Sequence, residues 1–429
     1  MAATDPNGSR ALAALTGAAL ALPGMTPTAQ AATPASQLEL EGGIYYYDEG
    51  SGRVTVRAIQ QGLITPLGDD LDLSLNLVRD SISGASPVYN VPELSCPGGV
   101  TIRPREPSLD SASGASGGPS SPLPQPLGGR PYTETACQPT AVQQILSTTR
   151  FADVREAVDL KLNRYLGDMT LGLGLGFSEE IDYSSHYLNL DLRRELNDKH
   201  TTLALGVGLA DDQFSPVNQP GFTGDKQVWN GLLGVTQVLD KYSLAQVNLT
   251  YADGSGYLTD PYKEIYVLST NSTQPEQRPD HRGQWNLLGR YTRWIPDLGG
   301  ALHFDYRYSW DDWGISAHTL DASWSQPLGD GWSITPGVRY YSQTAADFYQ
   351  DYFSYLPDDG IYSSDYRLAG FGALSYRLKL SKSLGDNIRL DAGVEYYDRR
   401  DGLALESSRG CGCADYDYLT VSLGWKLLF

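Results

Sequence analysis

The sequence LTVSLGWKLLF, residues 419–429, alternates apolar residues with small or polar ones without a break. One face of a strand made from it carries Leu419, Val421, Leu423, Trp425, Leu427 and Phe429. A strand that is buried on one face has this period of two. An apolar row at the end of a polar chain needs an apolar medium, and the obvious medium is lipid. The stretch therefore predicts the closing strand of a membrane β-barrel, paired with a strand over residues 38–47.

The other end of the chain resembles an export signal. Residues 11–22, ALAALTGAALAL, are followed by Pro23-Gly24 and by Ala29-Gln30-Ala31, a small-x-small cleavage pattern. We therefore predict a signal peptide over residues 1–31 and a mature chain over 32–429. No other run approaches the roughly 18 apolar residues of a spanning helix. An exported chain of this kind is either soluble or a barrel.

The composition favours the barrel. Tyr is the commonest aromatic residue, with 28 copies, and Gly reaches 46. Tyrosine suits the two membrane interfaces, and glycine suits tight turns and a crowded inner wall. The mean hydropathy of −0.33 is that of a soluble protein, but a barrel strand exposes only every second residue to lipid. The net charge of −19 argues against nucleic acid as a partner.

Alternating strands recur along the chain, and charges fall on the face opposite the apolar one. This holds for residues 71–77, 158–162, 188–192, 302–310 and 388–395, whereas in residues 171–177 the face opposite the apolar one carries only glycines. Such alternation also fits a soluble sandwich, because the pattern does not say which face points inward. Near the ends of the later strands, Trp285, Trp310 and Trp313 are expected in an interfacial aromatic girdle.

The connections decide between the two folds. Seven short segments rich in Gly, Asn and Asp predict tight turns, at 67–69, 166–168, 196–199, 239–241, 296–299, 328–331 and 384–387. The connections between them are longer and unequal. Short periplasmic turns and long extracellular loops are typical of an outer-membrane barrel. We predict an all-β transmembrane antiparallel β-barrel of about sixteen strands, with fourteen and eighteen left open because residues 226–240 and 362–380 are ambiguous.

Such a barrel leaves an aqueous lumen, so the leading hypothesis is a passive, porin-like channel for small solutes in bacterial outer-membrane lipid. No motif for a metal or cofactor occurs, and we expect none. The predicted pore lining consists of the charged residues on the inner faces: Asp159, Lys161, Asp191, Arg193, His303, Asp305, Arg307, Asp321, Arg339, Arg389 and Asp391.

A barrel hydrolase is a third hypothesis, after the channel and the receptor described below. Its candidate base is His303, which shares a face with Asp305, Arg307 and Ser309. A hydrolase needs a nucleophile, a base and an orienting group brought together in space, and the sequence shows no such spacing. A hydrated lumen histidine is the simpler interpretation, so we do not predict an enzyme.

The predicted loop over residues 84–150 is the longest connection. Its end, with Thr140 and Gln143 before Ile145, carries a capping-box pattern and predicts a short helix that folds into the barrel mouth. A flexible external arm is the alternative. A bridge from Cys96 to Cys137 is the first disulfide candidate, and Cys411 and Cys413 are two further candidate cysteines, which either bridge to this loop or form a labile pair.

Several segments resemble one bacterial family, catalogued as domain of unknown function 3570. They are SISGASPVY (81–89), DPYK (260–263), RPDHRGQW (278–285), DDWGISAHT (311–319), RYYSQTAADFY (339–349) and YSSDYRLAGFGALS (362–375). The resemblance implies a Gram-negative outer-membrane barrel, and it implies nothing about an activity. Members can be encoded near periplasmic redox proteins, which implies a second function: a structural sleeve or receptor for a periplasmic or surface redox partner.

Overall fold

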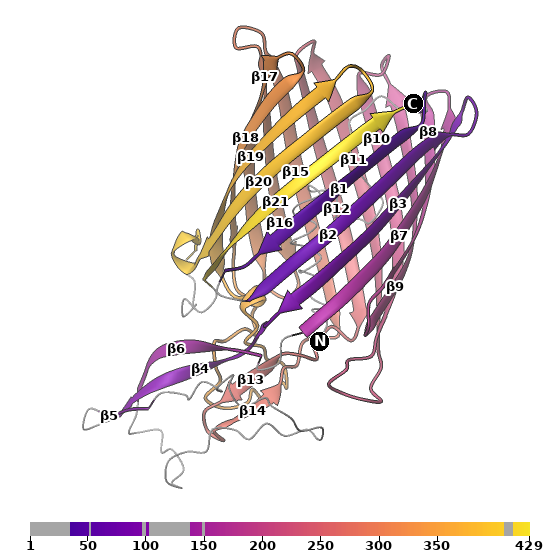
Figure 1. Cartoon of the computed structure of the whole chain (residues 1–429). Helices are drawn as coiled ribbons and strands as arrows, with labels where there is room; N and C mark the ends of the chain where they lie inside the picture. Colours follow the sequence, from indigo (N-terminus) through magenta and orange to yellow (C-terminus); the bar gives the residue numbers. More distant parts are fainter. Residues whose placement is uncertain (1–34, 51–52, 97–99, 103–137, 148–150, 407–414) are drawn as a thin grey trace.

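The computed structural model describes residues 35–50, 53–96, 100–102, 138–147, 151–406 and 415–429. Sixteen antiparallel strands close into a barrel in the order β1-β2-β3-β7-β8-β9-β10-β11-β12-β15-β16-β17-β18-β19-β20-β21 (Figure 1). The predicted fold and strand number are therefore confirmed. The predicted signal peptide lies outside the described residues.

The barrel strands are long enough to cross a bilayer at a tilt. They are β1 (Glu39–Asp48), β2 (Val54–Pro66), β3 (Leu71–Gly84), β7 (Phe151–Leu166), β8 (Met169–Glu179), β9 (Tyr183–Leu196), β10 (Thr201–Phe214), β11 (Gly224–Asp240), β12 (Ser243–Gly256), β15 (His281–Ile295), β16 (Gly300–Asp311), β17 (Ser316–Gly329), β18 (Trp332–Gln343), β19 (Phe371–Leu384), β20 (Ile388–Arg400) and β21 (Tyr416–Leu428). Both ambiguous stretches are resolved, since β11 is one strand and β19 begins at Phe371.

The strand over residues 416–428 closes the ring. Its register with β1 runs from Glu39 opposite Leu428 to Asp48 opposite Leu419, so the predicted pairing of the two outermost strands is confirmed. At one end of the barrel, which we call the turn end, seven tight connections join the strands in pairs. Positive φ angles occur there at Gly68, Gly167 and Gly385, and at the consecutive residues Asn197, Asp198 and Lys199. At the opposite end, the loop end, the connections are longer and unequal (Figure 1).

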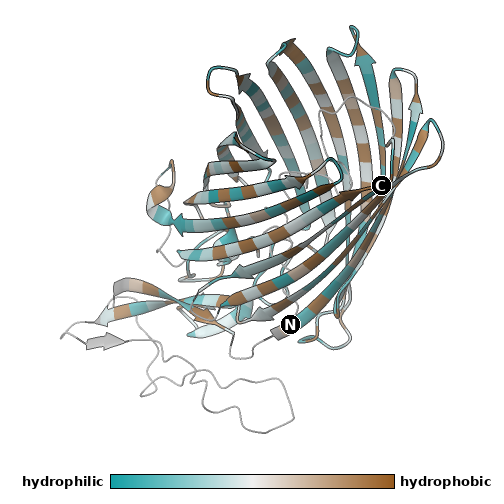
Figure 2. Cartoon of the chain, turned by 45° about the horizontal axis from the view of Figure 1, so that its top comes forward, coloured by the Kyte–Doolittle hydropathy of each residue, from teal (hydrophilic) through white to brown (hydrophobic). Residues whose placement is uncertain are grey.

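The apolar face of each strand points outward. Val207, Leu209 and Leu423 are 58%, 60% and 58% exposed, whereas Asn189 and Asp191 on the inner face are 3% and 8% exposed. Bands of opposite hydropathy alternate along the strands in Figure 2. An apolar exterior around a polar interior is inverted relative to a soluble protein, and it is stable only in lipid. The architecture is that of an outer-membrane barrel.

A row of aromatic rings follows the outside of the barrel toward the loop end. Trp229 packs on Tyr251 with ring centroids 5.2 Å apart, Tyr251 on Trp285 at 4.6 Å, and Trp285 on Trp310 at 6.1 Å. This row suits a membrane interface, where such rings concentrate. Trp313 does not belong to it. It lies in the connection after β16 and is 4% exposed, within an apolar cluster of loop residues.

Two small sheets lie beyond the loop end (Figure 1). The connection after β3 forms a three-stranded sheet of β4 (Pro87–Cys96), β5 (Val100–Ile102) and β6 (Gln138–Leu146). The predicted helix at residues 140–146 is therefore wrong, because this segment pairs with β4 and the ladder outweighs the capping-box signal. The second sheet pairs β13 (Glu264–Val267) with β14 (Ser272–Pro275).

The only helical elements in the described ranges are 3₁₀ turns, including η2 (Tyr366–Leu368) and η3 (Asp401–Leu403). Among those residues, no helix is long and apolar enough to cross a membrane. The disulfide candidates fall outside what the structure describes, because Cys137, Cys411 and Cys413 lie in undescribed segments and the Cys96 side chain is likewise not described.

Candidate functional site: a charged lumen beneath a folded cap

A cavity of about 1020 Å³ occupies the barrel interior, and we call it the vestibule. Its wall comes from β1, β2, β12 and β15 through β21, and includes both the first and the last strand of the ring. The residues that line it are mostly polar because they occupy the inward positions of alternating strands. At its turn-end margin, Lys426 Nζ donates to Glu39 Oε2 at 2.5 Å.

The charges of the vestibule wall are paired across neighbouring strands. Arg290 on β15 donates from Nη2 to Asp305 Oδ2 on β16 at 2.7 Å, and from Nε to both carboxylate oxygens. Asp321 on β17 accepts from Arg339 at 2.8 Å and from Arg377 at 2.5 Å. Two of these pairs follow the strand register, which sets Arg290 opposite Asp305 and Asp321 opposite Arg339. Arg377 of β19 reaches Asp321 of β17 across β18, where Gly337 stands opposite it. The lumen therefore carries both signs of charge, held at fixed positions by the ladder.

The residues predicted to line the lumen divide into two groups. Those that line the vestibule are His303, Asp305, Asp321, Arg389 and Asp391. Arg339 reaches it indirectly through Asp321. On the opposite wall, Asp191 accepts from Lys161 at 2.7 Å and lies 3.9 Å from Arg193. By strand alternation, Asp159 and Arg307 share the inward faces of Lys161 and Asp305. Their role in lining a pore stays a prediction.

Sequence reasoning missed several lining residues: Glu41, Gln246, Arg290, Arg377 and Glu395. These residues can be identified from the same alternation of apolar and polar residues once two neighbouring strands are aligned in their register. Arg290, for example, is found once β15 and β16 are placed in register.

Within the described ranges, the structure does not gather the groups of a hydrolase around His303. Its Nδ1 lies 3.3 Å from Thr292 Oγ1. Asp305, two residues along the same face, is engaged by Arg290, and Ser309 donates to Asn286 at 2.6 Å. The geometry therefore brings His303 to the vestibule without assembling a nucleophile, base and orienting group around it.

Two loop-end connections, residues 257–280 and 344–370, fold together into one layer that we call the cap. The backbone of Phe353 donates to Tyr266 O at 3.0 Å, and Leu268 N donates to Phe353 O at 2.8 Å. Ile265, Val267 and Phe353 are 0%, 1% and 2% exposed and form a small apolar core. A loop with its own backbone pairing and core is ordered rather than irregular.

The cap is held by a buried network of charges. Arg278 forms ion pairs with Glu276 and with Asp365, each at 2.6 Å. Arg367 contacts Asp365 and lies 2.5 Å from Asp260. Asp365 also caps the η2 turn by accepting from Arg367 N at 3.0 Å. Burial alone would raise the pKa of Asp365, but the charges of Arg367, Lys263 and Arg278 hold it well below its usual range.

On one side, the cap is attached to the inner wall of the barrel. Arg399 of β20, which is 2% exposed, donates to Tyr366 O at 2.5 Å. Gln343 of β18 donates to Arg367 O at 3.0 Å and to Ala369 O at 2.7 Å. These contacts come from inward-facing side chains, so the segment around η2 lies within the mouth.

The cap is attached on the opposite side as well. The Tyr262 hydroxyl donates to Asp182 in the connection between β8 and β9, and Asn218 Nδ2 donates to Pro261 O at 2.9 Å. In the ring of sixteen strands, β8 to β11 stand roughly half a turn from β18 to β20. The cap therefore reaches across the mouth from one wall to the other.

The sequence of this barrel matches the model of one protein family over most of its length. The model of DUF3570, described as a protein of unknown function, matches residues 12–223 and 217–412. The chain belongs to the DUF3570 family. The match covers both cap connections and every barrel strand except β21, which begins after residue 412. The capped architecture just described is therefore that of a DUF3570 member, and the predicted family is confirmed.

Solved structures similar to this DUF3570 barrel are outer-membrane proteins with very low identity. They include a bacterial polysaccharide outer membrane secretin, with a TM-score of 0.47 and 8% identity over 92% of this chain and 98% of that one. CdiB from Acinetobacter baumannii gives a TM-score of 0.49 and 9% identity over 92% and 60%. The CymD monoaromatic hydrocarbon channel gives 0.39 and 10% over 92% and 88%. No protein with a curated description matches the chain.

Proposed function

We propose that this DUF3570 barrel is a passive pore for small polar or charged solutes in the bacterial outer membrane, with its turn end in the periplasm and its cap controlling access. The observation that carries the proposal is the vestibule of about 1020 Å³ enclosed by paired charges. A cavity of that volume takes a solute of metabolite size. A wall built only for stability has no need of so many charged side chains, because packed apolar residues serve it equally well.

The arrangement of charges in the vestibule supports passage of both anionic and cationic solutes. Asp321 is shared by two arginines, whereas Asp391 is approached by Lys379 at 3.2 Å and by Arg389 at 3.3 Å. Acidic and basic groups thus alternate around one cavity. Selectivity in such a pore follows from where the charges stand and not from their sum.

The cap supports controlled and not constitutive passage. It joins two opposite walls through Arg399 and Tyr262, and its own charges are buried and paired. Passage through the mouth then needs the cap to loosen. Breaking its central pair leaves buried charge without a partner, which is costly, so the closed arrangement is favoured.

Conductance across planar bilayers tests the proposal. We compare the wild-type protein with Arg278→Ala/Asp365→Ala, which removes both members of a cap pair, and with Asp358→Asn, an exposed acidic residue in the same connection, as the matched control. The expected result is low or intermittent conductance for the wild type and the control, and larger, longer openings for the double variant. No step above background from any of the three preparations would overturn the pore.

The alternative of a sleeve or receptor for a redox partner stays a prediction from the family resemblance. Co-purification of a haem or flavin protein with the barrel would favour it, and conductance alone would not.

A further inference from the structure

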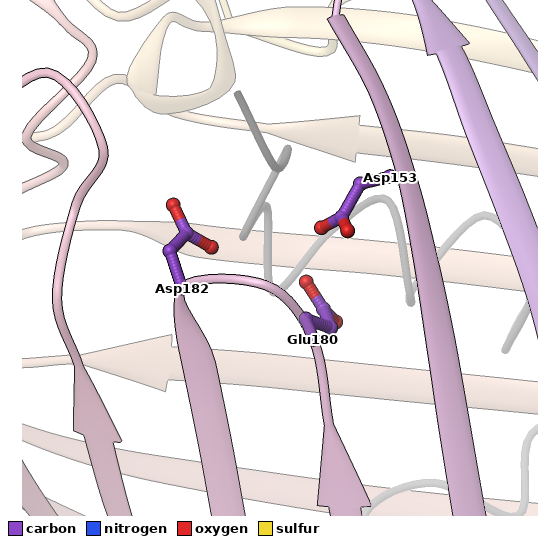
Figure 3. Close-up of side chains that lie close together, drawn as sticks. All are labelled: Asp153, Glu180 and Asp182. Carbon is purple, nitrogen blue, oxygen red and sulfur yellow. The ribbon is translucent and has the colours of Figure 1, made fainter.

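Three carboxylates converge at the loop-end rim, away from both the vestibule and the centre of the cap. Asp153 lies near the start of β7, while Glu180 and Asp182 come from the connection between β8 and β9. One ligand oxygen from each lies within 4.8 Å of the other two. Figure 3 shows the three side chains directed toward one another, one from β7 and two from the connection between β8 and β9. Like charges do not gather in this way without something that compensates them.

Each of the three carboxylates has one buried oxygen that lacks a hydrogen-bond partner. Asp153 and Asp182 are 8% and 4% exposed. Asp153 Oδ2, Glu180 Oε2 and Asp182 Oδ1 each have no hydrogen-bond partner in the structure. Their sister oxygens are partly used, since Asp153 Oδ1 accepts from Val154 N at 2.7 Å and Asp182 Oδ2 accepts from Tyr262. Buried carboxylate oxygens are normally satisfied, so three unsatisfied ones within one cluster of carboxylates indicate a missing ligand.

The described residues supply too little positive charge to take the place of that ligand. Arg155 is the nearby cation, and it is bound to Asp80, with Nη2 at 2.7 Å and Nε at 2.8 Å from Oδ2. Asp80 is itself 2% exposed and adds a fourth carboxylate to the same region. The four carboxylates thus outnumber the one arginine.

We propose that Asp153, Glu180 and Asp182 form a Ca²⁺ site. Carboxylate oxygens are the ligands that this hard cation prefers, at about 2.3–2.6 Å. Three carboxylates supplied by the protein suit Ca²⁺, which accepts a flexible shell of about six to eight oxygens, whereas Mg²⁺ usually keeps several waters and takes only one or two carboxylates. Water completes the coordination in sites of this kind, and the rim position admits it. The site does not depend on transport through the barrel.

The consequence of the ion is mechanical. Asp182 is the residue to which Tyr262 of the cap donates its hydroxyl. An ion on Asp182 fixes its carboxylate between β7 and the connection after β8, and therefore fixes the anchor of the cap on this side of the mouth. The strength with which the cap is anchored on this side therefore depends on the concentration of the cation.

Calorimetric titration with Ca²⁺ tests the proposal on full-length protein refolded in detergent and stripped with a chelator, so that no lipopolysaccharide contributes sites. We expect one ion per chain. Glu180→Gln and Asp182→Asn should each weaken binding by at least the roughly 10–100-fold that loss of even an orienting partner costs a metal site. Tyr262→Phe, which removes a hydrogen bond to the ligand Asp182, should weaken Ca²⁺ binding by about 10–100-fold. Asp358→Asn removes the same charge elsewhere and should bind as the wild type does.

Terbium luminescence gives a second readout, because Tb³⁺ occupies Ca²⁺ sites and is sensitised by a nearby phenol such as that of Tyr262. The emission should appear with the wild type, disappear on competition with Ca²⁺, and be absent from Glu180→Gln. The heat-dependent shift of gel mobility shows that each variant is a folded barrel. No binding by the wild type, or equal binding by folded Glu180→Gln and Asp182→Asn, would overturn the site and leave a carboxylate cluster neutralised by protons.

Discussion

The cap and the vestibule wall both rely on pairs of arginine and aspartate, but water reaches them differently. Asp365 of the cap is 3% exposed and Glu276 is 1% exposed. In the vestibule, the side chains of Arg389 and Asp391 are 51% and 25% exposed. A charge pair in a dry setting fixes a structure because either member alone is costly, whereas a hydrated pair contributes little to stability. The same chemistry therefore holds the cap together and only shapes the electric field of the lumen.

The sharpest way to break this comparison is to remove Asp365. Asp365→Ala leaves Arg278 and Arg367 buried without their shared partner, and we expect about 3–5 kcal/mol of local destabilisation. Hydrogen exchange of residues 260–276 and 344–368 should accelerate accordingly, while the barrel strands stay protected. Asp358→Asn is the control. Unchanged exchange of the cap amides would show that its apolar core, and not its charges, holds it.

The rim carboxylates Asp153, Glu180 and Asp182 are neither as well paired as the charges of the cap nor as hydrated as those of the vestibule. Their contribution to stability can be tested by varying the pH. Glu180 has an ordinary pKa of 4.5 and a folded pKa of about 8, chiefly because of burial. The folded state keeps the proton over this window, so the stability that Glu180 supports is complete below about pH 4.5 and is lost as the pH rises through 8. With chelator present, the loss is at most a few kcal/mol.

Urea unfolding midpoints at several pH values measure this effect. The wild type should lose stability between acid and alkaline conditions more steeply than Glu180→Gln, because the amide does not titrate. Added Ca²⁺ should remove most of the difference. Parallel profiles for the two proteins would contradict the assignment.

The packing of the lumen wall is tested by two glycines on the same face of β8. A Cβ on Gly172 would meet Asp191 Oδ1 at 2.3 Å, whereas one on Gly174 would find its nearest neighbour, Asn189 Cβ, at 3.6 Å. Gly172→Ala should therefore cost about 1–3 kcal/mol by displacing the Asp191 carboxylate from Lys161. Gly174→Ala is the matched control and should be close to neutral. Equal unfolding midpoints in lipid vesicles would argue against a tightly packed wall.

The smallest effect is expected in the vestibule itself. Asp391→Asn weakens contacts with Lys379 and Arg389 that water already screens, so stability should change by less than about 1 kcal/mol. The ion selectivity of the conducting state should nevertheless shift toward anions, measured as a reversal potential in a salt gradient. A large loss of stability would mean that this pair behaves like those of the cap.

Much of the fold could be predicted from the sequence because its signals are local. Period-two alternation and turns such as Leu384-Gly385-Asp386-Asn387 depend only on neighbouring residues, and the structure confirms them. Errors came where distant segments compete. Gln138–Leu146 became a strand because β4 offered it a ladder, and Trp313 left the expected girdle because residues of another loop cover it. The partnership of Arg290 and Asp305 needed a register that alternation alone does not provide.

The sequence by itself determined that the chain makes an antiparallel barrel, which strands pair with their neighbours and which face meets lipid. Those properties follow from the spacing of apolar residues and from turn residues that admit positive φ. The tertiary structure alone decided that residues 257–280 and 344–370 form a cap, and that Asp153 meets Glu180 and Asp182. Such contacts depend on closure of the sheet, which brings together side chains that no local pattern relates.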